Sequence, residues 1–244
     1  KVDPDEARWF NLVKTSETGK IHRMVYHQDT NCYSFGKQIL GAGSYANVYS
    51  FASIAVKDFI DDYSWAIELA VFELIQRAYP DPESVGLPRM LGYQERKIIM
   101  PKYQPIETMT DVHYKLVATA IYSLHRLGIV HRDIKDHNIV GNGILLDFGL
   151  SSWFPITRLR PRDTSIQTMP YRAPEVVIHP RGRYTMTIDE WSFGIMLASR
   201  KKLIYDPRTV QDLIKCLIKL FGGDYRTIEE KDPGCGEGFL QINP

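Results

Sequence analysis

Cysteine is scarce in this chain, and neither sign of charge dominates it. Three cysteines stand among 244 residues, at Cys32, Cys216 and Cys235. Because they are odd in number, far apart and without metal-ligand spacing, we expect a reducing, intracellular compartment, either cytoplasm or nucleus. The formal net charge is +1, so composition gives no support for a nucleic-acid partner or a membrane surface.

Long apolar runs and repeats are also lacking. No apolar stretch approaches the length of a membrane span, no signal peptide is visible, and we find no internal repeat or low-complexity tract. Hydrophobic residues make up 44% of the chain and charged residues 24%, which is ordinary for a soluble globular protein. A length of 244 residues suffices for one large domain or two small lobes.

One short polar stretch carries several groups that can act together. It reads His131-Arg132-Asp133-Ile134-Lys135-Asp136-His137-Asn138, and Asp147-Phe148-Gly149 begins nine residues after its end. Asp133 can accept a proton from an attacking hydroxyl, and Lys135 can neutralise a phosphoryl group in transfer. Asn138 and Asp147 offer the oxygen ligands that a hard cation such as Mg²⁺ prefers. The two motifs resemble the catalytic loop and the metal-binding motif of eukaryotic-type protein kinases.

A glycine-rich segment lies earlier in the chain. Residues 34–40 favour a strand, and residues 41–48 favour a turn and a return strand. Followed by Ala55-Val56-Lys57, the segment resembles the kinase glycine-rich loop and third-strand lysine. Ala46 replaces the usual third glycine, so we expect a stiffer loop or one slightly farther from the phosphates. The resemblance implies nucleotide contacts from Leu40, Gly41, Ala42, Gly43, Ser44, Tyr45, Ala46, Asn47, Val48, Ala55 and Lys57.

The lysine of this motif needs a carboxylate partner, because a lone ammonium in a cleft would wander or lose its proton. A helix is predicted to begin at a cap on Asp62 or Ser64 and to end before Pro80. Glu68 falls on the apolar stripe of this helix, whereas Glu73 lies about 140° around it. We therefore expect Glu68 to pair with Lys57; the alternative is that Glu68 is a solvated charge.

A further strand is predicted over residues 96–100, and the segment after it resembles the hinge of a kinase. The resemblance places Met100 beside the adenine and gives the backbone near Lys102 and Tyr103 the role of hydrogen-bonding the base. Between this hinge and His131 there is room for one long helix only, so a short helix that kinases usually carry there is expected to be reduced or lost.

The motif Thr168-Met169-Pro170-Tyr171-Arg172-Ala173-Pro174-Glu175 resembles the substrate-docking loop of the family. The resemblance implies that Thr168 hydrogen-bonds near Asp133 and Lys135, and that the acceptor is serine or threonine. The last five residues also resemble the cyclin-dependent and MAP kinase group, in which this arginine is associated with proline directly after the acceptor. Asp189 is expected to anchor the backbone of the catalytic loop.

Regulation by phosphorylation is one hypothesis for the segment before this motif. In the family, the arginine that matches Arg132 often pairs with a phosphate on that segment. Here the candidate acceptors are Thr164 and Ser165, and further cations are close by in sequence: Arg158, Arg160 and Arg162. The alternative is a solvated basic loop.

The resemblance implies an α+β, bilobal protein kinase fold with a small β-rich N-lobe containing one helix and a mainly helical, shortened C-lobe. The expected divisions are an N-terminal extension at 1–32, the N-lobe at 33–102 and the C-lobe at 103–244. An amphipathic helix is predicted at 210–221, and residues 224–244 contain no evident match to the further helices of the family.

The implied activity is transfer of the γ-phosphoryl group of ATP, with Mg²⁺, to serine or threonine of a protein substrate. The implied catalytic residues are Asp133, Lys135, Lys57, Glu68 and Thr168, and the implied metal ligands are Asn138 and Asp147. Three alternatives remain: a pseudokinase scaffold, a small-molecule kinase of related fold, and a kinase that works only with an activating protein subunit. No nucleic-acid or membrane partner is expected.

Overall fold

The computed structural model describes residues 38–43, 45–51, 53–153, 166–178, 184–200, 209, 212–213 and 215. The chain divides into two compact units, one formed by Lys1–His131 with His137–Trp153 and the other by Arg132–Asp136 with Phe154–Pro244. The catalytic-loop motif therefore contributes to both units. The lobe boundary near residue 102 stays a prediction.

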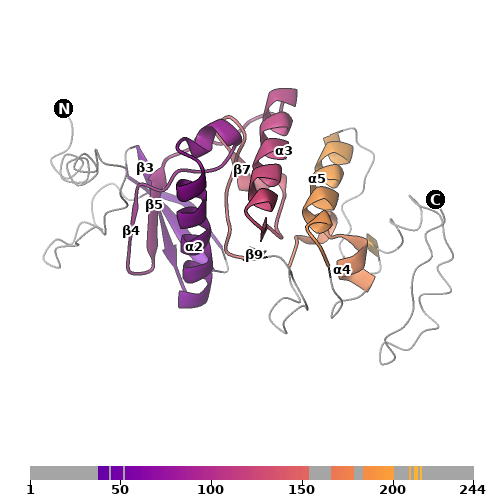
Figure 1. The fold of residues 1–244 in the computed structure, drawn as a ribbon, viewed down its shortest axis with the longest axis horizontal. Helices are drawn as coiled ribbons and strands as arrows, with labels where there is room; N and C mark the ends of the chain where they lie inside the picture. The colour runs from indigo at the N-terminus through magenta and orange to yellow at the C-terminus, as the bar shows by residue number, and fades with distance from the viewer. Residues whose placement is uncertain are drawn as a thin grey trace, which may run out of the picture. The chain divides into compact units, whose positions relative to one another are not determined.

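A five-stranded antiparallel sheet forms the β-rich part of the first unit (Figure 1). Its order is β1-β2-β3-β5-β4, and β3 lies at its centre. Val56 and Ile99 face each other across β3 and β5 and pack with Ile54 and Leu91 into a small apolar core. The strands are β1 (Gln38–Ala42), β2 (Ala46–Phe51), β3 (Ile54–Phe59), β4 (Gly92–Gln94) and β5 (Lys97–Pro101).

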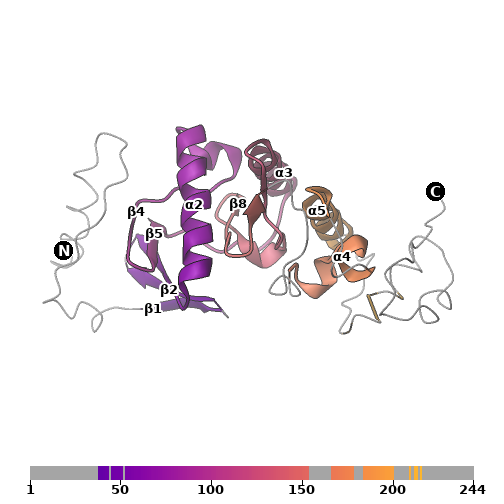
Figure 2. The same cartoon turned by 60° about the horizontal axis from the view of Figure 1, so that its bottom comes forward.

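The helix α2 (Asp62–Ala78) packs on this sheet (Figures 1 and 2). Of the face predicted from its periodicity it buries Glu68, Phe72 and Ile75, whereas Trp65 and Leu69 are only partly buried. Its C-cap is Tyr79, directly before Pro80. The predicted N-cap is wrong: the carboxylate of Asp61 accepts a hydrogen bond from the N–H of Ser64 at 2.8 Å. Asp61 takes this role because its backbone is still extended, whereas Asp62 already lies inside the helix.

The rest of the first unit lies after α2 along the chain. Residues 102–110 contain no helix, which confirms the expected loss of a short helix before α3 (Asp111–Arg126). None of the helices in the described residues combines the length and the apolar character that crossing a membrane requires. The remaining elements are short: η1 (Pro82–Val85), β6 (Ile129–Val130), η2 (Asp136–Asn138), β7 (Ile139–Val140), β8 (Ile144–Leu145) and β9 (Ser152–Trp153).

The described elements of the second unit are helices. Its elements are η4 (Met169–Tyr171), α4 (Pro174–Ile178) and α5 (Thr187–Arg200). Val177 and Leu213 are buried against each other, with Met169 and Trp191 packed around them. Within the helix predicted at 210–221, residues 212, 213 and 215 are helical, and the others lie outside the described residues.

Some of the sequence predictions fall outside the described residues altogether. They concern the N-terminal extension at 1–32, the start of the first strand at 34–37, the C-terminal residues 224–244, the loop residue Ser44 and the candidate phosphorylation segment at 158–165.

Candidate active site

Lys57, on the central strand β3, is held by two carboxylates. Its Nζ donates to Glu68 Oε1 at 2.9 Å and Oε2 at 2.7 Å, and to Asp147 Oδ1 at 2.7 Å. Glu68 is 1% exposed, so the alternative of a solvated helix charge is wrong, and the pairing predicted from helix geometry is present. All three groups belong to the first unit.

In this cluster, burial and the charge of the ion-pair partner shift the pKa values of Lys57 and Glu68 in opposite directions. Burial by itself lowers the pKa of the Lys57 ammonium, but the charges of Glu68 and Asp147 and the hydrogen bonds they accept raise it above its ordinary value. Burial raises the pKa of the Glu68 carboxyl from 4.5 to about 7, opposed by Lys57 and assisted by the like charge of Asp147. The lysine therefore stays charged at neutral pH, and the pKa of the Glu68 carboxyl lies above its ordinary value.

A cluster of aromatic rings in edge-on contact connects α2 to the segment that carries Asp147. The ring of Phe148 meets Phe72, one turn after Glu68, edge-on at a centroid distance of 5.6 Å, and meets His131 at 5.3 Å. Phe148 is fully buried, and the Nε2 atom of His131 lies 3.1 Å from the carbonyl oxygen of Leu146. Packing around Phe148 therefore fixes its neighbour Asp147 beside the Lys57–Glu68 pair.

The two predicted metal ligands flank a small hairpin. Strands β7 and β8 pair through Ile139 and Leu145, and the N–H of Leu146 donates to the carbonyl of Asn138 at 2.8 Å. Asp147, the residue after Leu146, is thereby brought next to Asn138, and its side chain is 46% exposed. An amide oxygen and a carboxylate with room for phosphate oxygens fit Mg²⁺, which usually takes one or two carboxylates plus substrate and water. In the described part of the chain, no group of three or more His, Cys, Asp or Glu side chains forms a separate metal centre.

The glycine-rich segment forms the predicted hairpin between β1 and β2. Ala42 pairs with Asn47, and the N–H of Gly43 donates to the carbonyl of Ala46 at 2.9 Å. Ala46 is buried at the start of β2, so its methyl group is accommodated without breaking the hairpin. A Cβ at Gly41, on β1 just before this turn, would meet no described protein atom within 4 Å. The predicted contacts Leu40 and Tyr45 are exposed, at 43% and 42%.

The predicted adenine contacts lie on neighbouring strands. Ala55 on β3 pairs with Met100 on β5, and both are buried, while Val48 on β2 pairs with Lys57. The N–H of Lys102 donates to the carbonyl of Ser53 at 2.8 Å, so this predicted donor is occupied.

Tyr103, the other predicted hinge residue, is anchored by its side chain. Its hydroxyl donates to Glu83 Oε1 at 2.7 Å and accepts from the N–H of Arg89 at 3.0 Å. Burial, with the hydrogen bond to Glu83 adding to it, raises the pKa of Tyr103 above its ordinary value. The phenol therefore stays protonated and ties the hinge segment to η1.

Asp133, the predicted base, lies in the second unit between a hydroxyl and an ammonium. Thr168 donates to its Oδ1 through Oγ1 at 2.8 Å and through the backbone N–H at 3.2 Å. Lys135 Nζ donates to its Oδ2 at 2.7 Å and to Thr168 Oγ1 at 2.9 Å. The carboxylate is thus oriented from both of its oxygens, and the three residues form the cluster that the motifs predicted.

The backbone just before Asp133 is fixed from α5. Asp189 Oδ1 accepts from the N–H of Arg132 at 2.8 Å, which confirms the anchoring role expected of Asp189. Arg132 itself is buried, and its Nη1 donates to the hydroxyl of Tyr184 at 2.6 Å. Sequence reasoning missed Tyr184, because nothing in its local pattern links it to a residue 52 positions earlier.

Gln167 is the second residue that sequence reasoning missed. It is buried, and its carbonyl accepts from Arg172 Nη2 at 3.0 Å and Nε at 3.3 Å. The hydroxyl of Tyr171, in the same loop, donates to Asp136 at 3.0 Å. A lone glutamine in a loop carries no signal of burial, since two partners of its side chain come from a helix 21 and 25 residues away.

A β-rich unit with a lysine–glutamate pair, and a helical unit with an oriented aspartate, are together the features of a phosphoryl-transferring enzyme of the protein kinase class. The family model of the protein kinase domain matches residues 92–221, more than half of the chain. The chain therefore belongs to the protein kinase family and has its α+β fold.

Curated relatives agree with this assignment. A Drosophila melanogaster protein named as a mitogen-activated protein kinase 14C is 33% identical over 131 residues, covering 50% of this chain and 35% of the relative. The serine/threonine kinase NLK of Caenorhabditis elegans is 29% identical over 167 residues, covering 63% and 25%. The serine/threonine-protein kinase SSN3 of Phaeosphaeria nodorum is 35% identical over 100 residues, covering 38% and 22%. The chain thus spans between 22% and 35% of the length of these relatives.

Proposed function

We propose that this chain transfers the γ-phosphoryl group of ATP, with Mg²⁺, to serine or threonine hydroxyls of protein substrates. The observation that carries the proposal is the buried Lys57 ammonium, held by Glu68 and in contact with Asp147. A buried cation fixed at this place by two carboxylates is ready to receive phosphate oxygens. A scaffold without nucleotide chemistry has no need for such a cluster.

Each step of the proposed phosphoryl transfer is assigned to particular residues of the chain. Lys57 binds the α- and β-phosphates while Glu68 holds it in place. Asp133 orients the acceptor hydroxyl and takes its proton, and Lys135 stabilises the charge of the group in transfer. Thr168 keeps the carboxylate of Asp133 in the orientation that this requires.

Mg²⁺ would be held by Asn138 and Asp147. When bound, it neutralises phosphate charge and fixes the direction of the phosphoryl group. Asp147 contacts Lys57 at 2.7 Å, so this lysine already lies beside the carboxylate that would bind the metal. Because Lys57 and Asp147 are this close, the phosphates of one nucleotide can contact both the lysine and the metal that Asp147 would hold.

The adenine is proposed to lie against Val48, Ala55 and Met100, on paired strands of the sheet. Since the N–H of Lys102 donates to Ser53, the base would be recognised through the backbone of Tyr103. We further propose the intracellular location and the lobe boundaries at 33–102 and 103–244 expected from the motifs.

A preference for proline directly after the acceptor is part of the proposal. The Gln167 carbonyl, next to Thr168, is occupied by the guanidinium of Arg172. A substrate residue with a backbone N–H would find no acceptor in this carbonyl, whereas proline has no N–H to satisfy. This observation supports the resemblance to the cyclin-dependent and MAP kinase group.

The first experiment is phosphoryl transfer from radiolabelled ATP and Mg²⁺ to generic serine and threonine peptides. The purified chain is expected to incorporate label, and Asp133→Asn is expected to lose about 100-fold or more in rate because the carboxylate base is gone. Equal incorporation by the chain and by Asp133→Asn would refute the assignment. If neither incorporates label, nucleotide-dependent thermal stabilisation, with and without candidate activating subunits, separates a pseudokinase from a kinase that requires a partner.

A further inference from the structure

Phe59 lies on β3 two residues after Lys57 and has no part in the chemistry proposed above. Residues two apart on a strand point to the same face of the sheet, and Phe59 is 3% exposed. The Nζ atom of Lys57 lies over the ring of Phe59, 5.1 Å from the ring centroid. At a separation within about 6 Å, the negative face of an aromatic ring attracts a cation. The lysine therefore has a partner besides its two carboxylates.

The place of this ring is fixed by the sheet. Phe59 pairs with Ala46 across β2 and β3, as Lys57 pairs with Val48. Because the side chains of directly opposed residues share one face of a sheet, the buried methyl group of Ala46 and the ring lie on the same side. The N–H of Phe59 donates to the carbonyl of Arg96 at 2.9 Å. Backbone pairing to both neighbours of β3 thus keeps the ring beside Lys57.

The ring differs from the carboxylates in what it takes from the ammonium. A lysine ammonium has three N–H donors, and the contacts to Glu68 Oε1, Glu68 Oε2 and Asp147 Oδ1 occupy all three. Phosphate oxygens can be bound by Lys57 only if one carboxylate contact is given up. The proposed function assigns Asp147 to Mg²⁺, so its contact is the one to be exchanged. An aromatic face attracts the charge without occupying any of these donors.

We propose that Phe59 is a positioning residue for the phosphate contact, and that its ring holds the ammonium of Lys57 while one N–H donor passes from Asp147 to the nucleotide. The inference rests on the proposed function. The attraction is strongest where water is excluded, as it is around this buried pair. A purely structural role would make Phe59 matter for every ligand alike, whereas this role concerns only ligands that carry phosphates.

Fluorine atoms on the ring test the attraction while nearly preserving the size of the side chain. Phe59 is replaced, through amber suppression, by 4-fluoro-, 3,5-difluoro- or 3,4,5-trifluorophenylalanine, because fluorine withdraws electron density from the negative face of the ring. Calorimetric titration of the full chain gives the dissociation constant of ADP with Mg²⁺. We expect this constant to rise along the series and to reach about tenfold with three fluorines. A constant that stays the same in the folded variants overturns the inference.

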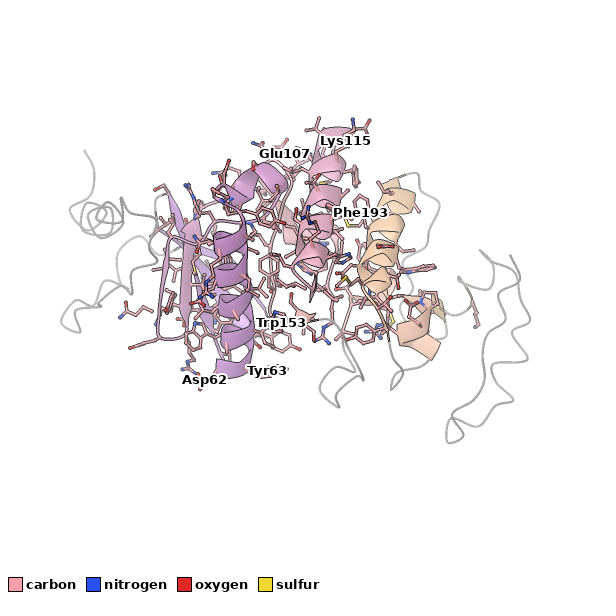
Figure 3. The ribbon with its side chains drawn as sticks, in the orientation of Figure 1. Asp62, Tyr63, Glu107, Lys115, Trp153 and Phe193 are labelled. Carbon is pink, nitrogen blue, oxygen red and sulfur yellow. The ribbon has the colours of Figure 1, made fainter. Side chains whose placement is uncertain are left out.

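A matched ligand and a matched position serve as controls. Adenosine has the base and ribose of ADP without its phosphates, so its affinity is expected to stay the same along the series. Phe193, labelled on α5 in Figure 3, belongs to the second unit and is not among the proposed phosphate contacts. Trifluorophenylalanine at position 193 should leave the affinity for ADP unchanged. Equal losses for adenosine and ADP, or equal losses at positions 59 and 193, overturn the inference.

Nuclear magnetic resonance on the nucleotide-free chain separates the inference from the proposed function. The methylene protons next to the Lys57 ammonium are expected upfield of their ordinary position, because of the ring current of Phe59, and are identified by their loss in Lys57→Met. Phe59→Leu should return them to the ordinary position. Unshifted protons in the wild type overturn the inference.

The two readouts fail separately. Shifted methylene protons in a chain that does not bind ADP would refute the proposed function, while the hold of the ring on Lys57 would stand. Phosphoryl transfer by a chain whose affinity for ADP ignores the fluorine series would leave the proposed function intact and overturn the inference.

Discussion

At the scale of single residues, the Lys57–Glu68 pair makes the sharpest prediction. Glu68→Gln keeps the size of the side chain but removes the charge that holds the ammonium. Because hydrogen bonds to charged groups are worth about 1.5–3 kcal/mol, we expect kcat/KM for ATP to fall about 10- to 100-fold. Glu73→Gln is the matched control: it lies on the same helix, and its carboxylate meets Arg77 at the surface, at 3.5 Å. Equal activity of the two variants would contradict the role of Glu68.

The same carboxyl predicts a pH dependence of stability. Its pKa is raised from 4.5 to about 7 by burial, so the folded chain binds this proton more tightly than the unfolded chain. The contribution of this carboxyl to the free energy of unfolding therefore falls as pH rises from about 4.5 to about 7. Above about pH 7 the contribution is constant. Urea unfolding at pH 5 to 8 measures this. Across the window, the free energy of unfolding should fall by about 1–3 kcal/mol more in wild type than in Glu68→Gln. Parallel pH profiles of the two proteins would be the contrary result.

At the scale of elements, the start of α2 separates two neighbouring aspartates. Asp61→Ala removes the cap on the N–H of Ser64 and should lower the free energy of unfolding by about 1 kcal/mol. Asp62→Ala is the control, because the side chain of Asp62 is 86% exposed and lies 3.8 Å from Arg96, where an ion pair contributes little. Thermal or urea unfolding of both variants provides the measurement. A larger loss in Asp62→Ala would show that the cap predicted from the sequence was correct after all.

Periodicity predicted the helix α2, because its apolar residues recur on one face within a single element. The failures of sequence reasoning have local causes. The strand β4 (Gly92–Gln94) was missed, because three residues are too few to show alternation. Asp61 was missed because Asp61, Asp62 and Ser64 are all common N-cap residues, and only backbone geometry distinguishes them.

Motif spacing predicted the site's clusters better than it predicted the residues that support them. Lys57, Glu68 and Asp133 have charged side chains at positions that a motif or a helix face defines. Gln167 and Tyr184 act through partners distant in sequence, so their roles depend on tertiary structure alone. Burial of a polar side chain cannot be read from a segment without periodicity.

At the scale of the whole molecule, nucleotide binding should be separable from catalysis. With Mg²⁺ and ADP at 100 times the dissociation constant, linkage predicts about 2.7 kcal/mol of stabilisation, which corresponds to roughly 5–10 °C in Tm. Lys57→Met is expected to lose most of this shift, because the phosphates lose their cation. Asp133→Asn should keep it, since Asp133 acts on the acceptor. Scanning calorimetry distinguishes these outcomes, and an undiminished shift in Lys57→Met would contradict the assigned phosphate contact.

The division of the chain has a consequence for any attempt to dissect it. Residues Arg132–Asp136 belong to the second unit although the first unit continues on both sides of them. Cleaving the chain at one position therefore cannot give two fragments that each contain a complete unit. A fragment ending at Trp153 would carry Arg132 and Asp133 away from Asp189 and Thr168, to which they are hydrogen-bonded. The two units alternate along the sequence. Complementation by two separately expressed halves would therefore have to form those hydrogen bonds between two chains.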